Sequence, residues 1–270
     1  MASPQIMTGG AENKAAFEPL AQNSFDGIAL ARELLRAIPS GALATLAAGS
    51  GFPFASLTSL ATASDGAPLL LLSGLAHHTR NLKADSRASL LLSQGGKGDP
   101  LAHPRLTLVG RLAPIAQDLA RDLARARFLR RHPKAELYAD FADFGFWRFE
   151  INAAHLNGGF ARAADYPGAD MLTDVSGAEK LLEAEAALLD ELNGAEGRGP
   201  SPLAELFGAP AKTRLWRASG LDPDGLDLTA PGETARIAFA TPARDPAQWR
   251  AALRTAAKDA PKTGADAPAP

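Results

Sequence analysis

The feature that most limits the possible folds is a long stretch without any charged side chain, residues 37 to 64. A membrane-spanning helix needs roughly 20 predominantly apolar residues in succession. Here Gly49, Gly51 and Pro53 interrupt the stretch, which is also rich in Ser and Thr. The pattern therefore predicts two buried strands around a turn, at 41 to 47 and 52 to 62.

Further strand patterns follow in short succession. They cover residues 67 to 73, 87 to 93 and 105 to 115, separated by turn-forming stretches such as "SDG" and "QGGKGDP". Gly110 lies inside the longest run and indicates a bulge or bend. A closing strand ends at Gly158 and Gly159. Helical spacing predicts helices at 27 to 38 and 116 to 131, the second with Leu119, Leu123, Ala126 and Leu129 on one face. These elements predict an α+β fold, a six-stranded antiparallel split β-barrel with peripheral helices.

The remaining sequence predicts a second, smaller unit. Residues 178 to 260 contain a helix at 178 to 192, three short strands and a closing helix at 245 to 260, capped by Asp245 or Thr241. We predict a barrel domain at 25 to 165, a linker at 166 to 177 and a small α+β domain at 178 to 260. The composition of residues 1 to 24 and 261 to 270 is typical of a disordered arm and tail.

Composition excludes several functional classes. The absence of cysteine excludes disulfides, thiolate metal sites and a cysteine nucleophile. A net charge of -2 gives no field for nucleic acid or an anionic membrane, and we expect neither as a partner. The first residues lack an export signal, so a cytoplasmic location is expected. No local histidine spacing suits a metal, and "DPDGLD" lacks the final Glu of a calcium loop.

The stretch "LLLLSGLAHHTRNL", residues 69 to 82, carries the strongest candidate site. A strand that ends in Ser73 and a helix entered at Thr79 would direct backbone N–H groups, hydroxyls and the Arg80 guanidinium toward one point, which favours an anion. Asn81 belongs to the same group. Adjacent histidine side chains diverge, so at most one faces the site, and His78 is the candidate. The alternative is an ordinary helix cap with surface histidines.

Several motifs together resemble a known family. In order they are "GALATL", "GFPFASLTSL", "LLLSGLAHHTRNLKADSRASLLL", "RLTLVGRL", "ARFLRRHPKAELYADFADFGFWRF" and "GGFARA". This series resembles the pyridoxamine 5'-phosphate oxidase-related, FMN-binding split-barrel family, and most closely its HugZ/HutZ-type haem-utilisation branch. The resemblance implies a homodimer with FMN at the subunit interface. The C-terminal part is similar to a small α+β domain that often follows this barrel, but residues 188 to 197 lack its two usual histidines.

The resemblance also implies roles for particular residues. The FMN phosphate would bind at Ser73 to Asn81, and Ser56 and Thr58 would contact the ribityl chain or the flavin ring. Arg105 and Thr107 would approach the isoalloxazine edge, and Trp147 would reach the partner subunit's site. The residues alone allow simpler interpretations: small polar side chains that fill a tight barrel, an exposed arginine at a strand end, and a core tryptophan.

Three functions remain open from the sequence. The first is an FMN-dependent oxidoreductase with an unidentified small substrate, whose catalytic residues are not assigned. The second is haem binding with oxidative haem cleavage, which needs an axial ligand, usually His. His155, His132 and His103 are then the candidates. The third is a flavin or haem carrier without turnover.

Overall fold

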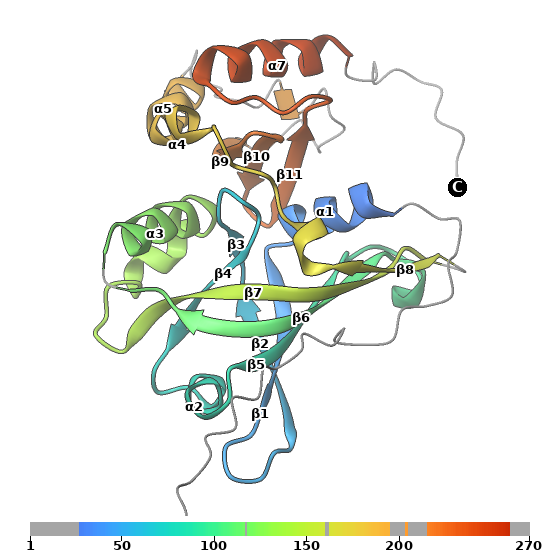
Figure 1. Cartoon of the computed structure of the whole chain (residues 1–270), viewed down its shortest axis with the longest axis vertical. Coiled ribbons are helices and arrows are strands. Elements are labelled where there is room, and N and C mark those ends of the chain that lie inside the picture. Colours follow the sequence, from blue (N-terminus) through green and yellow to red (C-terminus); the bar gives the residue numbers. More distant parts are fainter. Residues whose placement is uncertain (1–26, 117, 160–161, 195–202, 205–214, 260–270) are drawn as a thin grey trace, which may run out of the picture.

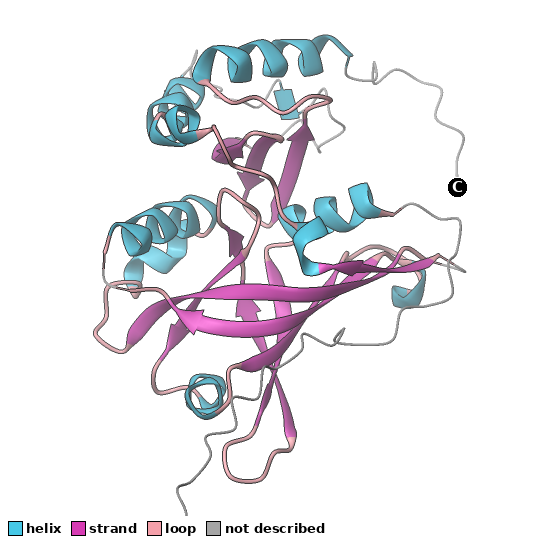
Figure 2. Cartoon of the chain, in the orientation of Figure 1, coloured by secondary structure: helices cyan, strands magenta, loops and turns pink. Residues whose placement is uncertain are grey.

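The computed structural model describes residues 27–116, 118–159, 162–194, 203–204 and 215–259. A curled antiparallel sheet forms the lower part of the molecule and a small three-stranded sheet with helices lies above it (Figures 1 and 2). The predicted arm and tail lie outside the described residues. No helix in the described ranges is long and apolar enough to cross a bilayer.

The large sheet follows the predicted strand patterns. Its strands are β1 (Ser40–Leu46), β2 (Pro53–Ser59), β3 (Ala61–Thr62), β4 (Pro68–Ser73), β5 (Arg87–Ser93), β6 (Arg105–Pro114), β7 (Phe144–Asn157) and β8 (Ala163–Pro167). They run in the order β2-β1-β5-β6-β7-β4-β3, with β8 paired to β7. The prediction of six strands corresponds to the longer ones, and the structure adds the short β3 and β8. The residues of β3 lie inside the predicted strand 52 to 62, which the structure divides at Leu60, and β8 lies where the sequence predicts the end of the barrel domain and the start of the linker.

The sheet closes on itself through one continuous segment of chain. β2 pairs with β1 at one edge, and β3 pairs with β4 at the other edge. Only Leu60, which is fully buried, separates β2 from β3. Because the two edges are consecutive parts of the same segment, they lie close together and the curled sheet is barrel-like.

Apolar side chains that alternate along these strands fill the barrel. The interior includes Leu43, Leu70, Leu90, Leu106 and Phe149, each fully buried. Three helices lie against the barrel: α1 (Ile28–Ala37), α2 (His77–Ala84) and α3 (Leu119–Arg131). Helix α2 packs on β1 and β2, and α3 packs on β3 and β4. Short 3₁₀ turns cover Pro100–Ala102, Pro133–Leu137 and Gly168–Met171.

The small sheet has its own apolar core. Its strands β9 (Arg217–Asp222), β10 (Gly225–Ala230) and β11 (Glu233–Ala238) pair in the order β11-β10-β9, beside α4 (Glu179–Glu183), α5 (Glu185–Gly194) and α7 (Pro246–Asp259). Trp216 and Trp249 are almost completely buried between them. Asp245, rather than Thr241, caps α7, because its Oδ1 accepts hydrogen bonds from the N–H groups of Ala247 and Gln248.

A buried network of ion pairs joins the small sheet to the barrel. The Asp222 carboxylate lies 3.0 Å from the Arg36 guanidinium of α1 and 2.9 Å from that of Arg236, which also binds Asp227 at 2.6 Å. A second link joins Arg127 of α3 to Glu185 of α5 at 2.9 Å. These charges lie between the two apolar cores, so their pairing fixes how the two parts meet.

The structure confirms the irregularity that the sequence predicts at Gly110, in the long strand β6. The register of β6 against β7 shifts between Val109 and Gly110. A Cβ atom at Gly110 would lie 1.9 Å from the carbonyl oxygen of Glu150, a backbone atom that cannot rotate away. The bend of the barrel therefore requires glycine at this position.

We expect Gly110→Ala to lower the free energy of unfolding by about 3 kcal/mol, the upper part of the range for an overpacked site. Urea unfolding measured by circular dichroism tests this. Gly95→Ala is the matched control, because a Cβ at Gly95 meets nothing within 4 Å. Equal changes in both variants would contradict the steric explanation.

Candidate functional site

The predicted anion motif begins where β4 turns into α2. The helix begins at His77, so both histidines belong to its first turn and Thr79 is its third residue. The Ser73 hydroxyl donates to the Asp143 carboxylate at 2.6 Å and accepts from the Leu75 N–H at 3.2 Å. Ser73 therefore already has partners, and one of them carries a negative charge.

A second group of predicted residues does come together, between β2 and α2. The Ser56 hydroxyl lies 3.1 Å from Nδ1 of His78. His78 Nε2 and the Thr79 hydroxyl are buried and have no hydrogen-bond partner among the described residues. Burial lowers the pKa of His78, which favours the neutral ring. Unsatisfied buried polar atoms are uncommon and are typical of positions where a ligand or water binds.

The other two polar residues of α2 have different roles. The Asn81 amide donates to the Thr45 hydroxyl at 3.0 Å and accepts from the Ala48 N–H at 3.0 Å. It therefore fastens α2 to the end of β1. Arg80 is exposed, and its guanidinium lies 3.0 Å from the His77 ring nitrogen, on the outer side of the helix.

The remaining predicted residues are dispersed. Thr58 faces the barrel interior and lies 3.4 Å from the carbonyl oxygen of Gly41. Arg105, at the start of β6, donates to the carbonyl of Leu101 at 3.0 Å. Trp147 is only 6% exposed and packs in the barrel core. Its position corresponds to the simpler interpretation, a core tryptophan.

A histidine and an aspartate form a further pair on the outer face of the barrel. His155 on β7 lies directly opposite Asp165 on β8, and its Nδ1 is 2.6 Å from the Asp165 carboxylate. The histidine side chain is 36% exposed, whereas the aspartate is 10% exposed. Hydrogen bonding to a carboxylate fixes the tautomer and the orientation of an imidazole ring, as in histidines that bind metals.

The other two histidines outside α2 are held differently. His132 is bonded through Nε2 to the carbonyl of Leu60 at 2.7 Å, and burial lowers its pKa. His103 lies 3.0 Å from the carbonyl of Lys97. Among His103, His132 and His155, only His155 pairs with a carboxylate within the described residues.

In the sequence, His155 is an isolated histidine without a recognisable partner nearby. The Gly158–Gly159 turn is the signal that could have revealed its partner, because a hairpin there places residue 155 opposite residue 165. The sequence instead predicts a linker from 166, so β8 remains unrecognised. In the structure the first residues of that linker end β8 and form the turn Gly168–Met171.

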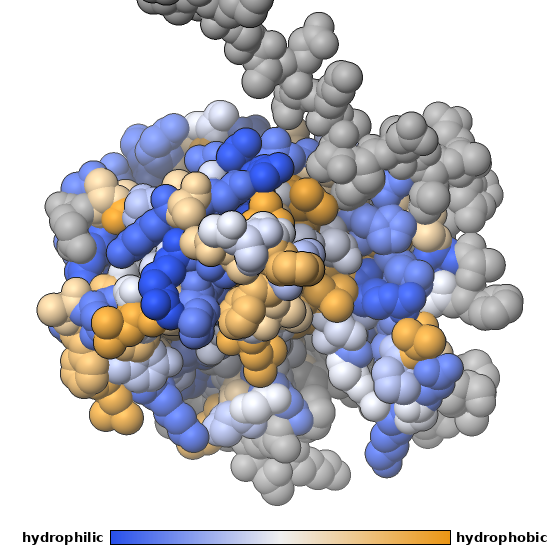
Figure 3. Space-filling model, turned by 90° about the horizontal axis from the view of Figure 1, so that it is seen from below, coloured by the Kyte–Doolittle hydropathy of each residue, from blue (hydrophilic) through white to orange (hydrophobic). Residues whose placement is uncertain are grey.

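The face around His155 is mostly small and apolar. A row of directly paired residues crosses five neighbouring strands from β7 to β2: His155, Thr107, Leu91, Ala42 and Leu57. Leu57 is 78% exposed and Leu91 is 39% exposed. The view from below shows apolar side chains gathered in patches on the barrel end of the molecule (Figure 3).

These features define a class of protein: an antiparallel β-barrel with one exposed apolar sheet face and a carboxylate-oriented histidine upon it. Residues 23–170 match the family model described as "CREG, beta-barrel". The chain belongs to the CREG beta-barrel family. The predicted barrel fold is confirmed at this level, and the closer relation to the HugZ/HutZ-type branch remains a prediction.

Three relatives extend the comparison. A structure of unknown function from Agrobacterium tumefaciens is 36% identical, with a TM-score of 0.78, and the match covers 88% of this chain and 100% of that one. A heme binding protein from Mycobacterium smegmatis is 30% identical, with a TM-score of 0.51, over 88% and 99% of the two chains. The non-canonical heme oxygenase HOZ, chloroplastic, from Arabidopsis thaliana is 36% identical over 115 residues. That match spans 42% of this chain but only 34% of the relative.

Proposed function

We propose that this protein binds haem on the outer face of the barrel, where His155 would hold the iron. The observation that carries the proposal is the hydrogen bond of 2.6 Å between His155 Nδ1 and Asp165. A histidine that ligates a metal through one ring nitrogen usually donates the other N–H to a carboxylate or carbonyl. Two relatives named for haem, from M. smegmatis and A. thaliana, support the choice of cofactor.

The residues around His155 suit a flat, largely apolar ligand with two acidic groups. Thr107, Leu91 and Leu57 lie in the row of paired residues that extends from His155 across the sheet. Arg105 begins the same strand as Thr107 and lies two residues from it, at the edge of the apolar face. Its guanidinium is suited to a propionate.

The iron of bound haem would supply redox and oxygen chemistry. The chain itself would orient the axial imidazole through Asp165 and limit access of water by its apolar face. Haem cleavage, as in the name of the A. thaliana relative, is a further step of the proposal, because the match covers 34% of that relative. A carrier without turnover would need the same binding residues.

A second copy of the chain completes the proposed site. Leu57 of β2 and Leu91 of β5 expose large apolar side chains on the same face of the sheet as His155. Burial of such a face against an identical one is favourable and is typical of homodimers. The cofactor would then lie between two barrels, as the sequence resemblance implies for FMN.

FMN is the second candidate, and a specific observation favours it. His78, whose Nε2 is unsatisfied, lies 3.1 Å from Ser56, which the family resemblance places against a flavin, and the hydroxyl of the next residue, Thr79, is also unsatisfied. The bonds of Ser73 to Asp143 and of Asn81 to Thr45 leave fewer groups for the phosphate. An FMN oxidoreductase with a small substrate is therefore the alternative to haem binding.

The two candidates give different spectra. We expect stoichiometric haemin to produce a sharpened, shifted Soret band in the purified full-length protein, with a Kd in the micromolar range or below. FMN added under the same conditions should keep its fluorescence and show no saturable binding. Saturable quenching of FMN without any Soret shift would overturn the haem proposal and support the flavin.

A further inference from the structure

A cavity of about 660 Å³ lies between α3 of the barrel and helices α4 and α5 of the small unit. Pockets that bind small molecules typically measure about 300–1,000 Å³. Its location is distinct from the face that carries His155, because His155, Asp165 and Thr107 are absent from its lining. It is therefore a candidate for a separate ligand.

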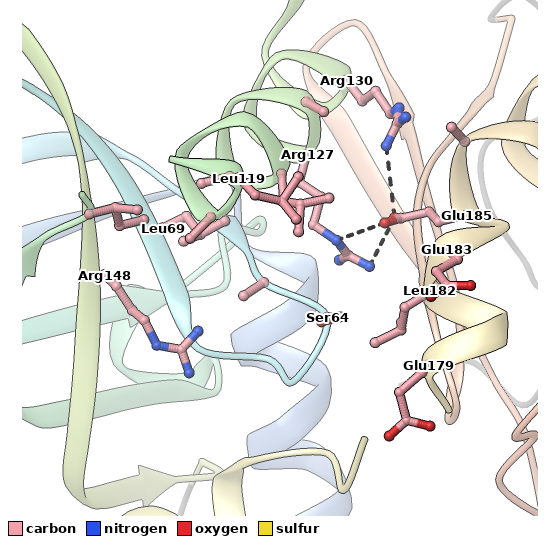
Figure 4. Close-up of a pocket in the computed structure, with 17 residues that line it drawn as sticks. Ser64, Leu69, Leu119, Arg127, Arg130, Arg148, Glu179, Leu182, Glu183 and Glu185 are labelled. Carbon is pink, nitrogen blue, oxygen red and sulfur yellow. Dashed lines mark hydrogen bonds and ion pairs between the residues drawn. The ribbon is translucent and has the colours of Figure 1, made fainter. Parts of the chain in front are cut away.

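The walls of the cavity are mainly apolar and come from both parts of the chain. Leu69, Ile115, Leu119 and Leu123 line it from the barrel, and Leu182 projects into it from α4 (Figure 4). Leu119 is 72% exposed and Leu123 is 54% exposed. Two leucines one helical turn apart are costly to leave in water, and a bound apolar chain would cover them.

The charges around the cavity are arranged asymmetrically. Arg130 and Arg148 approach from the barrel, whereas Glu179 and Glu183 are carried by α4 on the opposite side (Figure 4). Arg148 is engaged by Asp65 through two hydrogen bonds. An anionic group is therefore attracted to the α3 side and repelled from the α4 side.

Arg130 is the cation best suited to meet that anion. Its guanidinium lies 3.9 Å from Glu185, at the outer limit of an ion pair. The same carboxylate is held at 2.9 Å by Arg127 and accepts from the backbone N–H of Leu221. Glu185 is thus committed to other partners, and its charge compensates Arg130 only weakly.

We propose that this cavity binds a small amphipathic molecule with an apolar chain and one carboxylate, with the carboxylate at Arg130 and the chain against Leu119, Leu123 and Leu182. The ligand would bridge α3 and α4, so it would also strengthen the contact between the barrel and the small unit. Its binding needs neither haem nor FMN.

Calorimetric titration of the cofactor-free, full-length protein with decanoate and with decylamine tests the proposal. These probes share one chain length and differ in the charge of the head group. We expect saturable binding of decanoate and at least tenfold weaker binding of decylamine. Absence of decanoate binding, or equal affinity for the amine, would overturn the proposal.

Two exposed positions allow matched variants that should fold normally. Leu123→Ser should weaken decanoate binding at least tenfold, while Leu137→Ser, at a leucine 79% exposed outside the cavity, should leave it unchanged. Arg130→Glu should weaken decanoate at least tenfold and strengthen decylamine. Equal affinities of the wild type and Leu123→Ser would show that decanoate binds elsewhere and would refute the assignment. Binding to phosphatidylglycerol vesicles but not to free decanoate would likewise refute it in favour of a membrane surface.

Discussion

Asp222→Ala is expected to lower the free energy of unfolding by about 3–5 kcal/mol, the range for removal of one partner from a buried ion pair. Asp222 is completely buried at the end of β9. Its carboxylate contacts Arg36 at 3.0 Å and Arg236 at 2.9 Å. The substitution leaves two buried guanidinium groups with less negative charge nearby, and Arg36 is only 4% exposed, so water compensates little for the lost carboxylate.

The same network predicts how stability changes with pH. Burial by itself raises the pKa of Asp222, but the charges of Arg36 and Arg236 more than offset this effect and lower the pKa to about 2. An unfolded Asp has a pKa of about 3.9. Because the folded pKa is depressed, the stabilising contribution is fully present above pH about 4 and is lost as the pH falls toward 2.

Urea unfolding followed by tryptophan fluorescence and circular dichroism measures both effects. Asp222→Asn keeps the shape of the side chain and should be destabilising but less so than Asp222→Ala. Glu191→Ala removes an exposed partner of Arg250 and should leave the unfolding midpoint unchanged. If Asp222→Ala behaved like Glu191→Ala, the buried network would not hold the two parts together.

Local patterns predicted most individual elements of the fold. Alternating apolar residues revealed the longer strands, Gly110 marked the register shift in β6, and Asp245 capped α7. The order of the strands in the sheet could not be predicted from such local patterns. The pairing of β1 with β5 and of β4 with β7 depends on which distant faces bury one another. A pattern within one segment carries no information about this choice.

Helix α3 shows why the buried face of a helix can be misjudged. Its leucine-bearing face, with Leu119 and Leu123, lines the cavity and is largely exposed, whereas Arg127, Phe128 and Arg131 are buried. Hydrophobic periodicity counts arginine as a polar, outward residue. Here Arg127 pairs with Glu185 and donates to the backbone carbonyls of Thr62 in the barrel and Leu221 in the small unit, so its burial depends on partners far away in the sequence.

The sequence predicted only part of the candidate site, because several of its contacts involve residues that are far apart in the sequence. Ser56 and His78, which the family resemblance assigns to a flavin site, are brought together by the packing of α2 on β2. The partners of Ser73 and Asn81, which are Asp143 and Thr45, are distant in sequence and were not foreseen. These bonds hold Ser73 and Asn81 to the protein itself, and their contacts with a cofactor stay predictions.

His155→Ala is expected to abolish the axial coordination of haem and thus the sharpened Soret band of the complex. Haem would then bind only through its apolar surface and propionates. Asp165→Asn should have a smaller effect, with affinity lowered about 10- to 100-fold, the usual cost of losing the group that orients a ligating histidine. Haemin titrations followed by absorbance distinguish these outcomes.

Two controls separate ligation from structural damage. His103→Ala removes a half-buried histidine that contacts the Lys97 carbonyl, and it should leave the spectrum unchanged. Free imidazole added to His155→Ala should restore the band, because the small ligand can occupy the space of the missing ring. A normal Soret band in His155→Ala without added imidazole would assign the axial ligand to another residue. In that case the hydrogen bond between His155 and Asp165 would serve only to hold β8 against β7. The unsatisfied polar atoms of His78 and Thr79 would then be the stronger indication of where a cofactor binds.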